Sequence, residues 1–234
     1  MAFNGDINNN TTFLEHLFNK GIKCYGYEKI ITIINYIYNN YKLPIISVGS
    51  GTCIIEYLSN KKYNEKYNKN MNWICIDSDN NPLNFPPQAS YYLSRPLMNI
   101  DYNSSDELIQ NNPSIVGNCI LFLNWCLPNE STYDYDAIIK LKPLAVLSIY
   151  EVFNDDYGSA GGKKFYDWTI NNDNYNLKEM YKLYYEDDEL EYNEKIDIRI
   201  GWWQNNNIFN NDDAVIIHLP CMHYIRKSDN CSIS

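Results

Sequence analysis

The stretch Leu43–Leu58, with the sequence LPIISVGSGTCIIEYL, contains the pattern that decides the fold. An apolar run that ends at Val48 leads into the turn Gly49–Thr52, and a helix-like pattern follows. This order is typical of a buried parallel strand that ends in a tight turn and feeds a helix. Glycines in such a turn let a ligand approach the backbone, and the N–H groups that open the helix can receive polar or anionic ligand groups. The stretch therefore predicts the start of a nucleotide-type cofactor site, with a tight connection that binds nothing as the alternative.

The next predicted strand, Met71–Ile76, ends at an acid. Its sequence MNWICI is apolar and favours a β-strand, and Asp77 follows it, 28 residues after Gly49. In a β–α–β unit the acid that closes the second strand lies beside the first glycine turn, where it accepts hydrogen bonds from both ribose hydroxyls. A surface turn at 77–79 is the alternative interpretation. The glycine turn and the acid together favour a ribose-bearing cofactor.

These two segments resemble the first motifs of the class I S-adenosylmethionine-dependent methyltransferases. Gly49 and Gly51 match the first two glycines of that family's turn, and Asp77 matches its ribose-binding acid. Two positions depart from the family's pattern. Cys53 stands at the third glycine, and Ser47 stands where the family has an acid that helps hold the loop and the methionine end of the cofactor. The resemblance implies S-adenosylmethionine as the cofactor.

The resemblance extends over roughly residues 25–220. Asn118–Asn129, with the sequence NCILFLNWCLPN, is similar to the family's fourth strand and its exit loop. Leu144–Tyr150 is similar to the fifth strand, and a glycine-rich loop, Gly158–Gly162, follows before Phe165. This order is similar to a branch of methyltransferase-like proteins found in eukaryotes and large DNA viruses.

Methyl transfer from a sulfonium requires positioning of the acceptor, exclusion of water and sometimes a base. The resemblance implies catalytic roles for four residues: Asn124, Trp125, Pro128 and Glu151. It implies cofactor contacts for six others: Ser47, Gly49, Ser50, Gly51, Asp77 and Asp101. In this assignment Asn124 orients an amine nucleophile, Trp125 stacks on a planar substrate or fills the sheet's edge, and Glu151 is a base, a substrate ligand or a solvated loop acid. Asp101 contacts the adenine amino group or only caps a turn.

The alternation of apolar runs and helical patterns predicts an α/β fold: a Rossmann-like, doubly wound, mostly parallel seven-stranded sheet with a C-terminal antiparallel hairpin. Parallel strands are expected near 44–48, 72–76, 96–100, 118–123 and 144–149. Helices are expected from Thr11 or Thr12 and over 28–41, 133–142 and 163–170, the last with Phe165 and Trp168 inward. An edge strand is expected to open at Leu183, and the strand 196–203 is expected to pair with 214–219. One domain, 11–225, is predicted between tails at 1–10 and 226–234.

Composition narrows the possible partners. The 234 residues are 45% hydrophobic, enough for one full core, and the net charge is −10. Because duplex nucleic-acid binders normally present a basic face, we expect no tight binding of long nucleic acid. The basic segment Lys61–Lys69, which includes Tyr63 and Tyr67, is either a solvated helix end or a small stacking and phosphate-contact patch. The methyl acceptor stays open among a small molecule, a protein and a nucleic-acid end, and so does the oligomeric state.

The cysteines and histidines indicate no metal site and a reducing compartment. Seven cysteines without a Cys-x-x-Cys pattern fit reduced thiols in the cytosol, and three of them, in or beside predicted buried strands or the glycine turn, serve as small hydrophobic residues. Cys126 as a nucleophile is a minor alternative, and Pro220 breaks the spacing of His218 and His223. We expect no secretory peptide and no membrane span, hence a cytoplasmic protein, in the host cytoplasm or a viral factory if viral. The heavy use of Asn, Tyr, Ile and Lys is expected of an AT-rich genome, such as that of a large DNA virus.

Three functions follow from these patterns. The first is an active S-adenosylmethionine-dependent methyltransferase. The second is a catalytically degenerate methyltransferase fold that acts as a binding or interaction protein, which the departures at Ser47 and Cys53 motivate. The third is a nicotinamide-dependent oxidoreductase, which the sequence disfavours because Ile54 stands at the last glycine of the Gly-x-Gly-x-x-Gly fingerprint.

Overall fold

The computed structural model describes residues 27–77, 96–124, 132–151, 162–185 and 196–206. Its helices are α2 (Tyr27–Tyr41), α3 (Ile54–Tyr67), α5 (Ser105–Asn111), α6 (Tyr133–Leu141) and α7 (Lys163–Asn171), with a short 3-10 turn, η2 (Pro113–Ile115). Its strands are β1 (Ile45–Val48), β2 (Trp73–Ile76), β3 (Ile120–Asn124), β4 (Ala145–Glu151), β5 (Tyr175–Tyr185) and β6 (Ile196–Asn205).

The described strands form one six-stranded sheet in the order β2-β1-β3-β4-β6-β5. The first four are mutually parallel, and β6 runs antiparallel to both β4 and β5. Val48 at the end of β1 is level with Ile76 of β2 and with Leu123 of β3, so these three strands end at one edge of the sheet. The predicted Rossmann-like, mostly parallel α/β sheet is confirmed with six strands in the described residues; the seventh strand and the C-terminal hairpin stay predictions.

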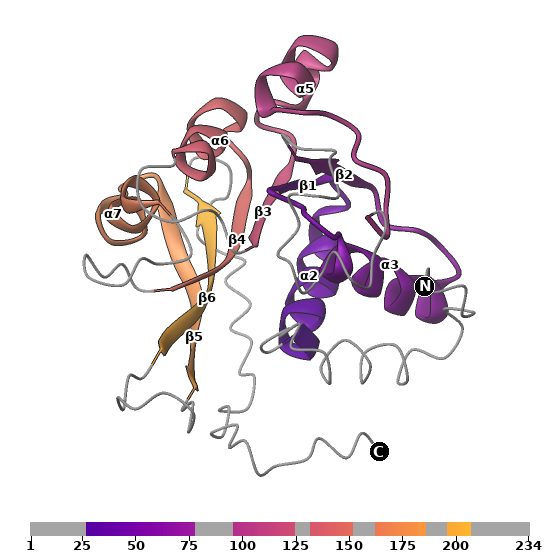
Figure 1. The fold of residues 1–234 in the computed structure, drawn as a ribbon, viewed down its shortest axis with the longest axis horizontal. Helices are drawn as coiled ribbons and strands as arrows, with labels where there is room; N and C mark the ends of the chain where they lie inside the picture. Colours follow the sequence, from indigo (N-terminus) through magenta and orange to yellow (C-terminus); the bar gives the residue numbers. More distant parts are fainter. Residues whose placement is uncertain (1–26, 78–95, 125–131, 152–161, 186–195, 207–234) are drawn as a thin grey trace, which may run out of the picture.

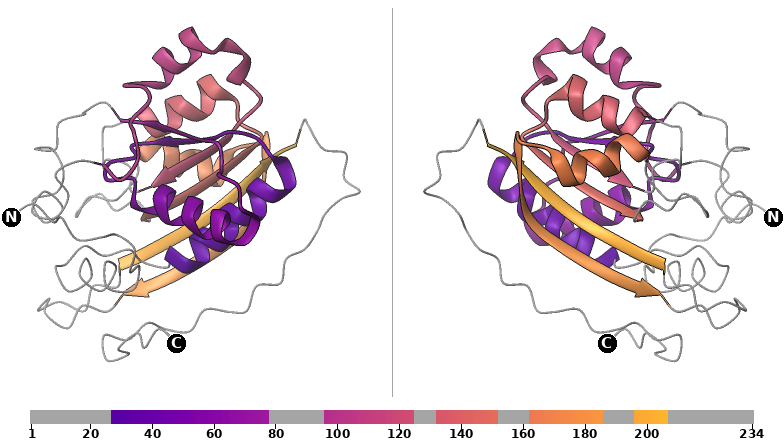
Figure 2. Two further views of the ribbon diagram at one scale, coloured as in Figure 1. Left: turned by 90° about the vertical axis from the view of Figure 1, so that its right-hand side faces the viewer. Right: turned by 90° about the vertical axis from the view of Figure 1, so that its left-hand side faces the viewer.

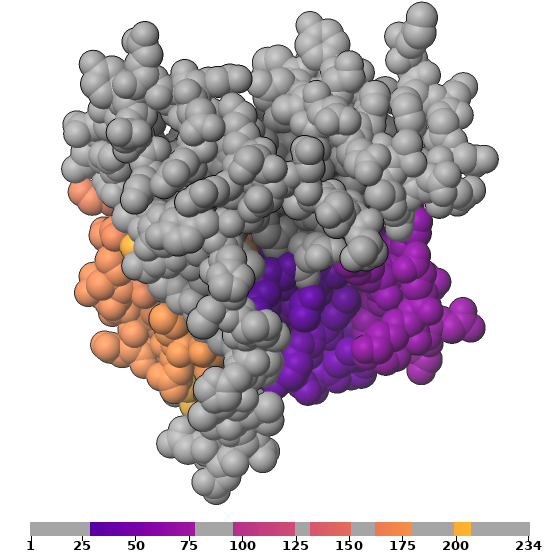
Figure 3. Space-filling model, turned by 90° about the horizontal axis from the view of Figure 1, so that it is seen from below, coloured from indigo at the N-terminus to yellow at the C-terminus, as the bar shows by residue number. Residues whose placement is uncertain are grey.

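Helices cover both faces of the sheet (Figures 1 and 2). The side chains of each strand alternate between the two faces: Ile45 and Phe122 pack with α2 and α3, whereas Ile46 and Leu121 pack with α5, α6 and α7. Parallel strands buried on both faces are nearly continuously apolar, which is why β1, β3 and β4 could be predicted from sequence. Seen from below, the residues of α2 and α3, indigo to purple, lie together on one side of the molecule (Figure 3).

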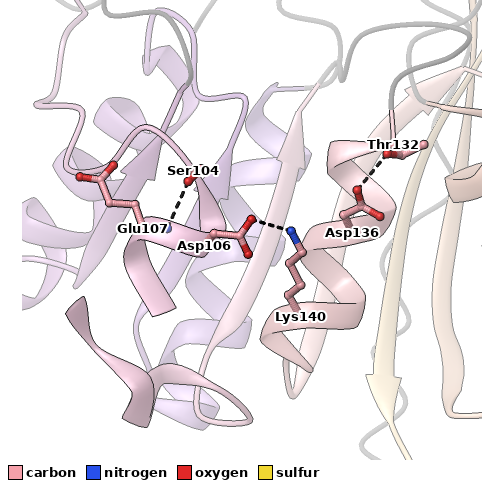
Figure 4. A network of polar contacts seen from close by, with 6 residues as sticks. All are labelled: Ser104, Asp106, Glu107, Thr132, Asp136 and Lys140. Carbon is pink, nitrogen blue, oxygen red and sulfur yellow. Dashed lines mark hydrogen bonds and ion pairs between the residues drawn. The ribbon is translucent and has the colours of Figure 1, made fainter. Parts of the chain in front are cut away.

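A polar network fixes the ends of α5 and α6 (Figure 4). The Ser104 hydroxyl caps α5 by accepting the Glu107 N–H at 3.1 Å, and Thr132 donates to the Asp136 carboxylate at 2.8 Å in the first turn of α6. Lys140 of α6 pairs with Asp106 of α5 at 2.7 Å. Because both partners of this pair are exposed, it contributes at most about 1 kcal/mol. The Ser104 cap therefore sets where α5 begins, whereas Thr132 contacts α6 only through the Asp136 side chain.

Two predicted strands differ from the structure. The strand expected near 96–100 is wrong: these residues form no strand, and the isolated bridge to Ile76 of β2 comes only at Tyr102. The Asp101 side chain takes the N–H of Cys75 on the outer edge of β2, so no ladder continues there. The edge strand β5 begins at Tyr175 rather than near Leu183 and pairs with β6. The expected N-terminal helix and the strand 214–219 lie outside the described residues.

The remaining predicted elements are confirmed with small shifts at their ends, and Phe165 and Trp168 of α7 are buried as expected. None of the described helices combines the length and the apolar character needed to cross a membrane.

Candidate functional site

The glycine turn lies where the sheet changes its direction of winding. From β1 the chain passes through α3 to β2 on one side, and β3 lies on the other side of β1. In open α/β sheets, ligands bind outside the carboxyl ends of the strands at such a switch point. The turn at Gly49–Cys53, the acid after β2 and the end of β3 all meet there.

The turn has a left-handed backbone at three alternating positions. Gly49 has a φ of 71°, Gly51 a φ of 52° and Cys53 a φ of 55°. Glycine adopts this conformation without strain, whereas Cys53 adopts it at the N-cap of α3 with a Cβ present. The sequence pattern thus identified the turn correctly, and Cys53 has the left-handed backbone expected of the third glycine that it replaces.

The N–H groups of the turn are occupied by the protein itself. Gly49 and Ser50 both donate to the Ile76 carbonyl, at 3.0 and 3.1 Å, and Cys53 donates to the Ser50 carbonyl at 2.8 Å. Gly51 donates to Oδ2 of Asp77 at 2.7 Å. These four donors are therefore not available to an anionic ligand, contrary to the expectation that the turn's N–H groups receive one.

Ser50 holds the turn together from within. Its buried hydroxyl donates to the Ser47 carbonyl at 3.0 Å and accepts the Ile76 N–H at 3.2 Å. These bonds join the ends of β1 and β2 through the Ser50 side chain. Ser50, which was predicted to contact the cofactor, is thus placed as a support of the turn.

The two predicted acids lie on opposite sides of β2. Asp77 is half-buried beside the turn and is fixed there by the Gly51 N–H. Asp101 is exposed at the outer edge of β2, where its Oδ2 accepts the Cys75 N–H at 2.8 Å. The structure therefore brings Asp77 to the glycine turn as predicted. The Asp101 carboxylate instead accepts a backbone N–H of β2.

An acid that sequence reasoning missed lies behind the turn. Ser47 is fully buried, and its hydroxyl donates to Oε1 of Glu56 at 2.5 Å. Glu56 comes from the first turn of α3 and is itself fully buried, and its Oε2 has no hydrogen-bond partner among the described residues. Burial raises the pKa of the Glu56 carboxyl to about 7; the bond from Ser47 lowers this pKa and nearby Asp77 raises it. An acid thus occupies the space behind the turn although Ser47 supplies none.

This buried carboxyl predicts a pH-dependent stability. Between about pH 4.5 and 7, folded Glu56 holds a proton that the unfolded chain has lost, so stability falls as pH rises through this range. The full loss above pH 7 amounts to about 3 kcal/mol for a pKa difference of this size. Glu56→Gln should remove the loss, and urea unfolding at pH 5 and pH 8 measures it.

The exposed Asp106→Asn is the control for that comparison, because its charge lies at the surface. An equal pH dependence in the wild type and in Glu56→Gln would contradict the placement of Glu56. Buried Asp134 also has a raised pKa, caused by desolvation, so the difference between variants isolates Glu56.

On the far side of β1, the Tyr133 side chain lies against Gly49, and β3 ends at Asn124. A Cβ built on Gly49 would lie 2.9 Å from the Tyr133 hydroxyl, so this phenol rests on the turn. Asn124 is the last residue of β3 and follows Leu123, the partner of Val48. Its Oδ1 is buried and has no partner within the described part of the chain. Asn124 thus lies at the tip of β3 as predicted, and its role beside the transferred methyl stays a prediction. Tyr133, which the sequence did not single out, lies against the turn.

Asp134 fixes the position of Tyr133. The buried Asp134 carboxylate accepts the Tyr135 N–H at 2.7 Å and the Gly162 N–H at 2.8 Å. It thereby joins the first turn of α6 to the residue that precedes α7. The remaining predicted site residues, Trp125 and Pro128, lie outside the described residues, and Glu151 ends β4 without a described side chain.

The signals for the missed residues were weak. Glu56 lies on the same stripe of α3 as Ser59 and Tyr63, at a spacing that favours one buried face. From that spacing, Glu56 could have been predicted to be buried and to face the sheet. Nothing in the sequence distinguishes Tyr133 from the other tyrosines.

The Tyr–Lys segment of α3 is largely occupied by internal contacts. Tyr63 is buried and accepts a hydrogen bond from Lys42 at 2.9 Å, and Lys42 also donates to Asn39 at 2.7 Å. Tyr63 is therefore not available to stack on a base, which favours the interpretation as a helix end packed on α2.

Other features lie apart from the turn. A cavity of about 810 Å³ between α6 and α7, lined by residues that include Tyr135, Lys142 and Trp168, lies at the amino end of β4. Within the described ranges, no group of three or more His, Cys, Asp or Glu side chains could hold a metal ion. Cys53 and Cys75 are buried free thiols beside the turn, and contact with Cys75 together with burial raises the pKa of Cys53.

Comparisons with known proteins gave structural likenesses only. The sequence matches no protein-family model, and no curated protein is significantly similar to it. Among solved structures, the chain is similar to a SAM-dependent methyltransferase from Anabaena variabilis, with 11% identity over 76% of this chain and 84% of that chain, and a TM-score of 0.42. It is also similar to a candidate class I S-adenosylmethionine-dependent methyltransferase from Listeria monocytogenes, with 11% identity over 86% and 70% and a TM-score of 0.48. A candidate RNA methyltransferase from Pyrococcus horikoshii gives 13% identity over 76% and 82%, with a TM-score of 0.38.

Proposed function

We propose that the chain is an S-adenosylmethionine-dependent methyltransferase whose cofactor binds at the glycine turn. The observation that carries the proposal is the turn itself: the Gly51 N–H holds the Asp77 carboxylate at 2.7 Å, at the switch point of the sheet. A second carboxyl, that of Glu56, lies behind the turn. Two acids beside a turn whose N–H groups are occupied favour a ligand that carries hydroxyls and positive charge.

S-adenosylmethionine has both properties, because it carries a ribose, an ammonium group and a sulfonium. Asp77 would accept hydrogen bonds from the ribose hydroxyls, and Gly49 and Gly51 would let the methionine portion approach the backbone. When bound, the cofactor supplies an electrophilic methyl group. Asn124, whose buried Oδ1 has no partner in the described chain, would accept a hydrogen bond from an amine acceptor and orient it.

The nicotinamide alternative is disfavoured by the same geometry. A pyrophosphate needs free N–H donors at the helix start, yet Gly49, Ser50, Gly51 and Cys53 donate to protein oxygens. Thermal shift tests this distinction: S-adenosylhomocysteine should raise the melting temperature and NAD should not. The reverse result would contradict the proposal. If the protein binds the cofactor, a screen of methyl acceptors then separates an active methyltransferase from a catalytically degenerate one.

Gly51→Ala should weaken binding of S-adenosylhomocysteine at least tenfold. An alanine Cβ at Gly51 would meet no protein atom within 4 Å, so it would project into space where the ligand approaches. The control is Gly117→Ala, because Gly117 also has a positive φ, 77°, and equally open surroundings, but lies before β3 at the other end of the sheet.

Both substitutions should cost about 1 to 2 kcal/mol of stability, since both place a side chain in the left-handed region. Calorimetric titration then separates the two, because only Gly51→Ala should lose affinity. Equal affinity in both variants would show that no ligand approaches the turn at Gly51.

A further inference from the structure

Glu56 is an ionisable residue in a fully buried position, where an apolar side chain would pack without the cost of burying a carboxyl group. Its side chain is fully buried, one oxygen accepts a hydrogen bond from Ser47, and the other has no partner among the described residues. A buried carboxyl with one unpartnered oxygen is unfavourable to folding, and a glutamine or a methionine of similar size would avoid ionisation there. A residue that is unfavourable to stability at a switch point is a candidate for a role in binding.

The groups that face Glu56 leave its charge uncompensated. Ser47 contacts it from β1, Asp77 acts on it from the end of β2, and Cys53 lies near it at the start of its own helix. None of these groups is a cation, and no lysine or arginine of the described ranges forms an ion pair with Glu56. The carboxylate form therefore needs a positive partner that the described protein does not provide.

We propose that Glu56 is the counter-charge for the ammonium group of the ligand's amino-acid end, which the glycine turn holds above it. This inference rests on the proposed function, because it assumes that S-adenosylmethionine binds at the turn. Glu56 acts through its electric field rather than by contact, since its oxygens are buried behind the turn, where solvent does not screen them. It is a positioning residue that takes over the charge that Ser47 does not carry.

The proposal makes ligand binding release a proton. Near pH 7 about half of the free protein carries a protonated Glu56, and a bound cation favours the ionised form. If the cation lowers the pKa of Glu56 by one unit, about 0.4 of a proton is released per ligand at pH 7. The ionised protein then binds about tenfold more tightly than the protonated one.

The test is calorimetric titration of S-adenosylhomocysteine into the full chain, in two buffers with different ionisation enthalpies. Glu56→Gln should bind as tightly as the wild type at pH 5, about fivefold more weakly at pH 7 and about tenfold more weakly at pH 8. It should also lose the proton release. Ser59→Ala is the matched control, because Ser59 is equally buried in α3 and donates only to the Glu56 carbonyl.

Methylthioadenosine, which lacks the amino-acid end, gives the second comparison. It should bind the wild type and Glu56→Gln equally, without proton release. If the wild type and Glu56→Gln bind S-adenosylhomocysteine equally and release the same number of protons, the inference is overturned. It is also overturned if Glu56→Gln loses the same affinity for both ligands, because that loss indicates a structural effect. If the wild type binds neither ligand, the proposed function fails as well, and this outcome differs from failure of the Glu56 role alone.

Discussion

Asp77→Ala should lower the affinity for S-adenosylhomocysteine at least 100-fold while the protein stays folded. In the proposed site the carboxylate accepts hydrogen bonds from two ribose hydroxyls, and hydrogen bonds to a charged group contribute about 1.5 to 3 kcal/mol each. Losing both corresponds to about two or more orders of magnitude in the dissociation constant. The substitution also removes the acceptor of the Gly51 N–H, which should cost about 1 to 2 kcal/mol of stability.

Asp77→Asn separates these two effects. The asparagine oxygen can still accept the Gly51 N–H, so the turn should keep its shape while the charge is lost. An intermediate affinity, about tenfold below the wild type, is expected. Asp106→Ala is the control for loss of a carboxylate, because Asp106 is exposed and pairs only with Lys140 at the far end of α6. Wild-type affinity in Asp77→Ala would contradict the assignment of the site.

Gly201→Ala should destabilise the fold by about 3 kcal/mol. Gly201 and Trp203 lie on the same face of β6, and an alanine Cβ at Gly201 would lie 2.1 Å from the Trp203 ring. The ring is fully buried and packs against Trp168 at 5.4 Å and Tyr150 at 6.0 Å, so it has little room to move. Overpacking of such a core commonly costs about 1 to 3 kcal/mol. Urea unfolding measures the change as a lower midpoint at an unchanged slope.

The direction of this effect is informative, because alanine in an unobstructed strand is more favourable than glycine by about 0.5 to 1 kcal/mol. In the background Trp203→Leu, which removes the ring, Gly201→Ala should become nearly neutral. The double-mutant cycle should therefore give a coupling energy close to the full cost of Gly201→Ala. Additive effects would show that the two positions do not touch.

Local sequence patterns determined most of the sheet. The strands β1, β3 and β4 are buried on both faces, so their sequences are continuous apolar runs that few other elements could produce. The glycine turn and the acid after β2 were predicted at the correct positions, because both depend on residues next to the strand ends. The helices α6 and α7 followed from their spacing and from the inward Phe165 and Trp168.

The edges of the sheet could not be predicted in the same way. An edge strand exists only where a neighbour offers free backbone groups, and this depends on the partner. Residues 96–100 are apolar enough for a strand, but Asp101 takes the outer N–H of Cys75, so the ladder stops. The strand β5 begins eight residues before Leu183 because it follows the length of β6, which its own sequence does not reveal.

The candidate site shows the same division. Gly49, Gly51 and Asp77 are local features of strand ends, and the sequence identified them. The hydrogen bond between Ser47 of β1 and Glu56 of α3 depends on how the helix packs on the strand, which local sequence patterns do not reveal. From the sequence, Ser47 is only a departure from the acid that the methyltransferase pattern has at this position. The structure shows that Ser47 donates a hydrogen bond to a buried acid, Glu56.

The central claim is that the glycine turn and its acids bind S-adenosylmethionine. Calorimetric titration of S-adenosylmethionine into the purified wild-type protein tests it most directly, with NAD as competitor. We expect one binding site per chain, a micromolar dissociation constant and no displacement by NAD. Folded protein that gives no heat of binding, or a complex that NAD displaces, would contradict the claim.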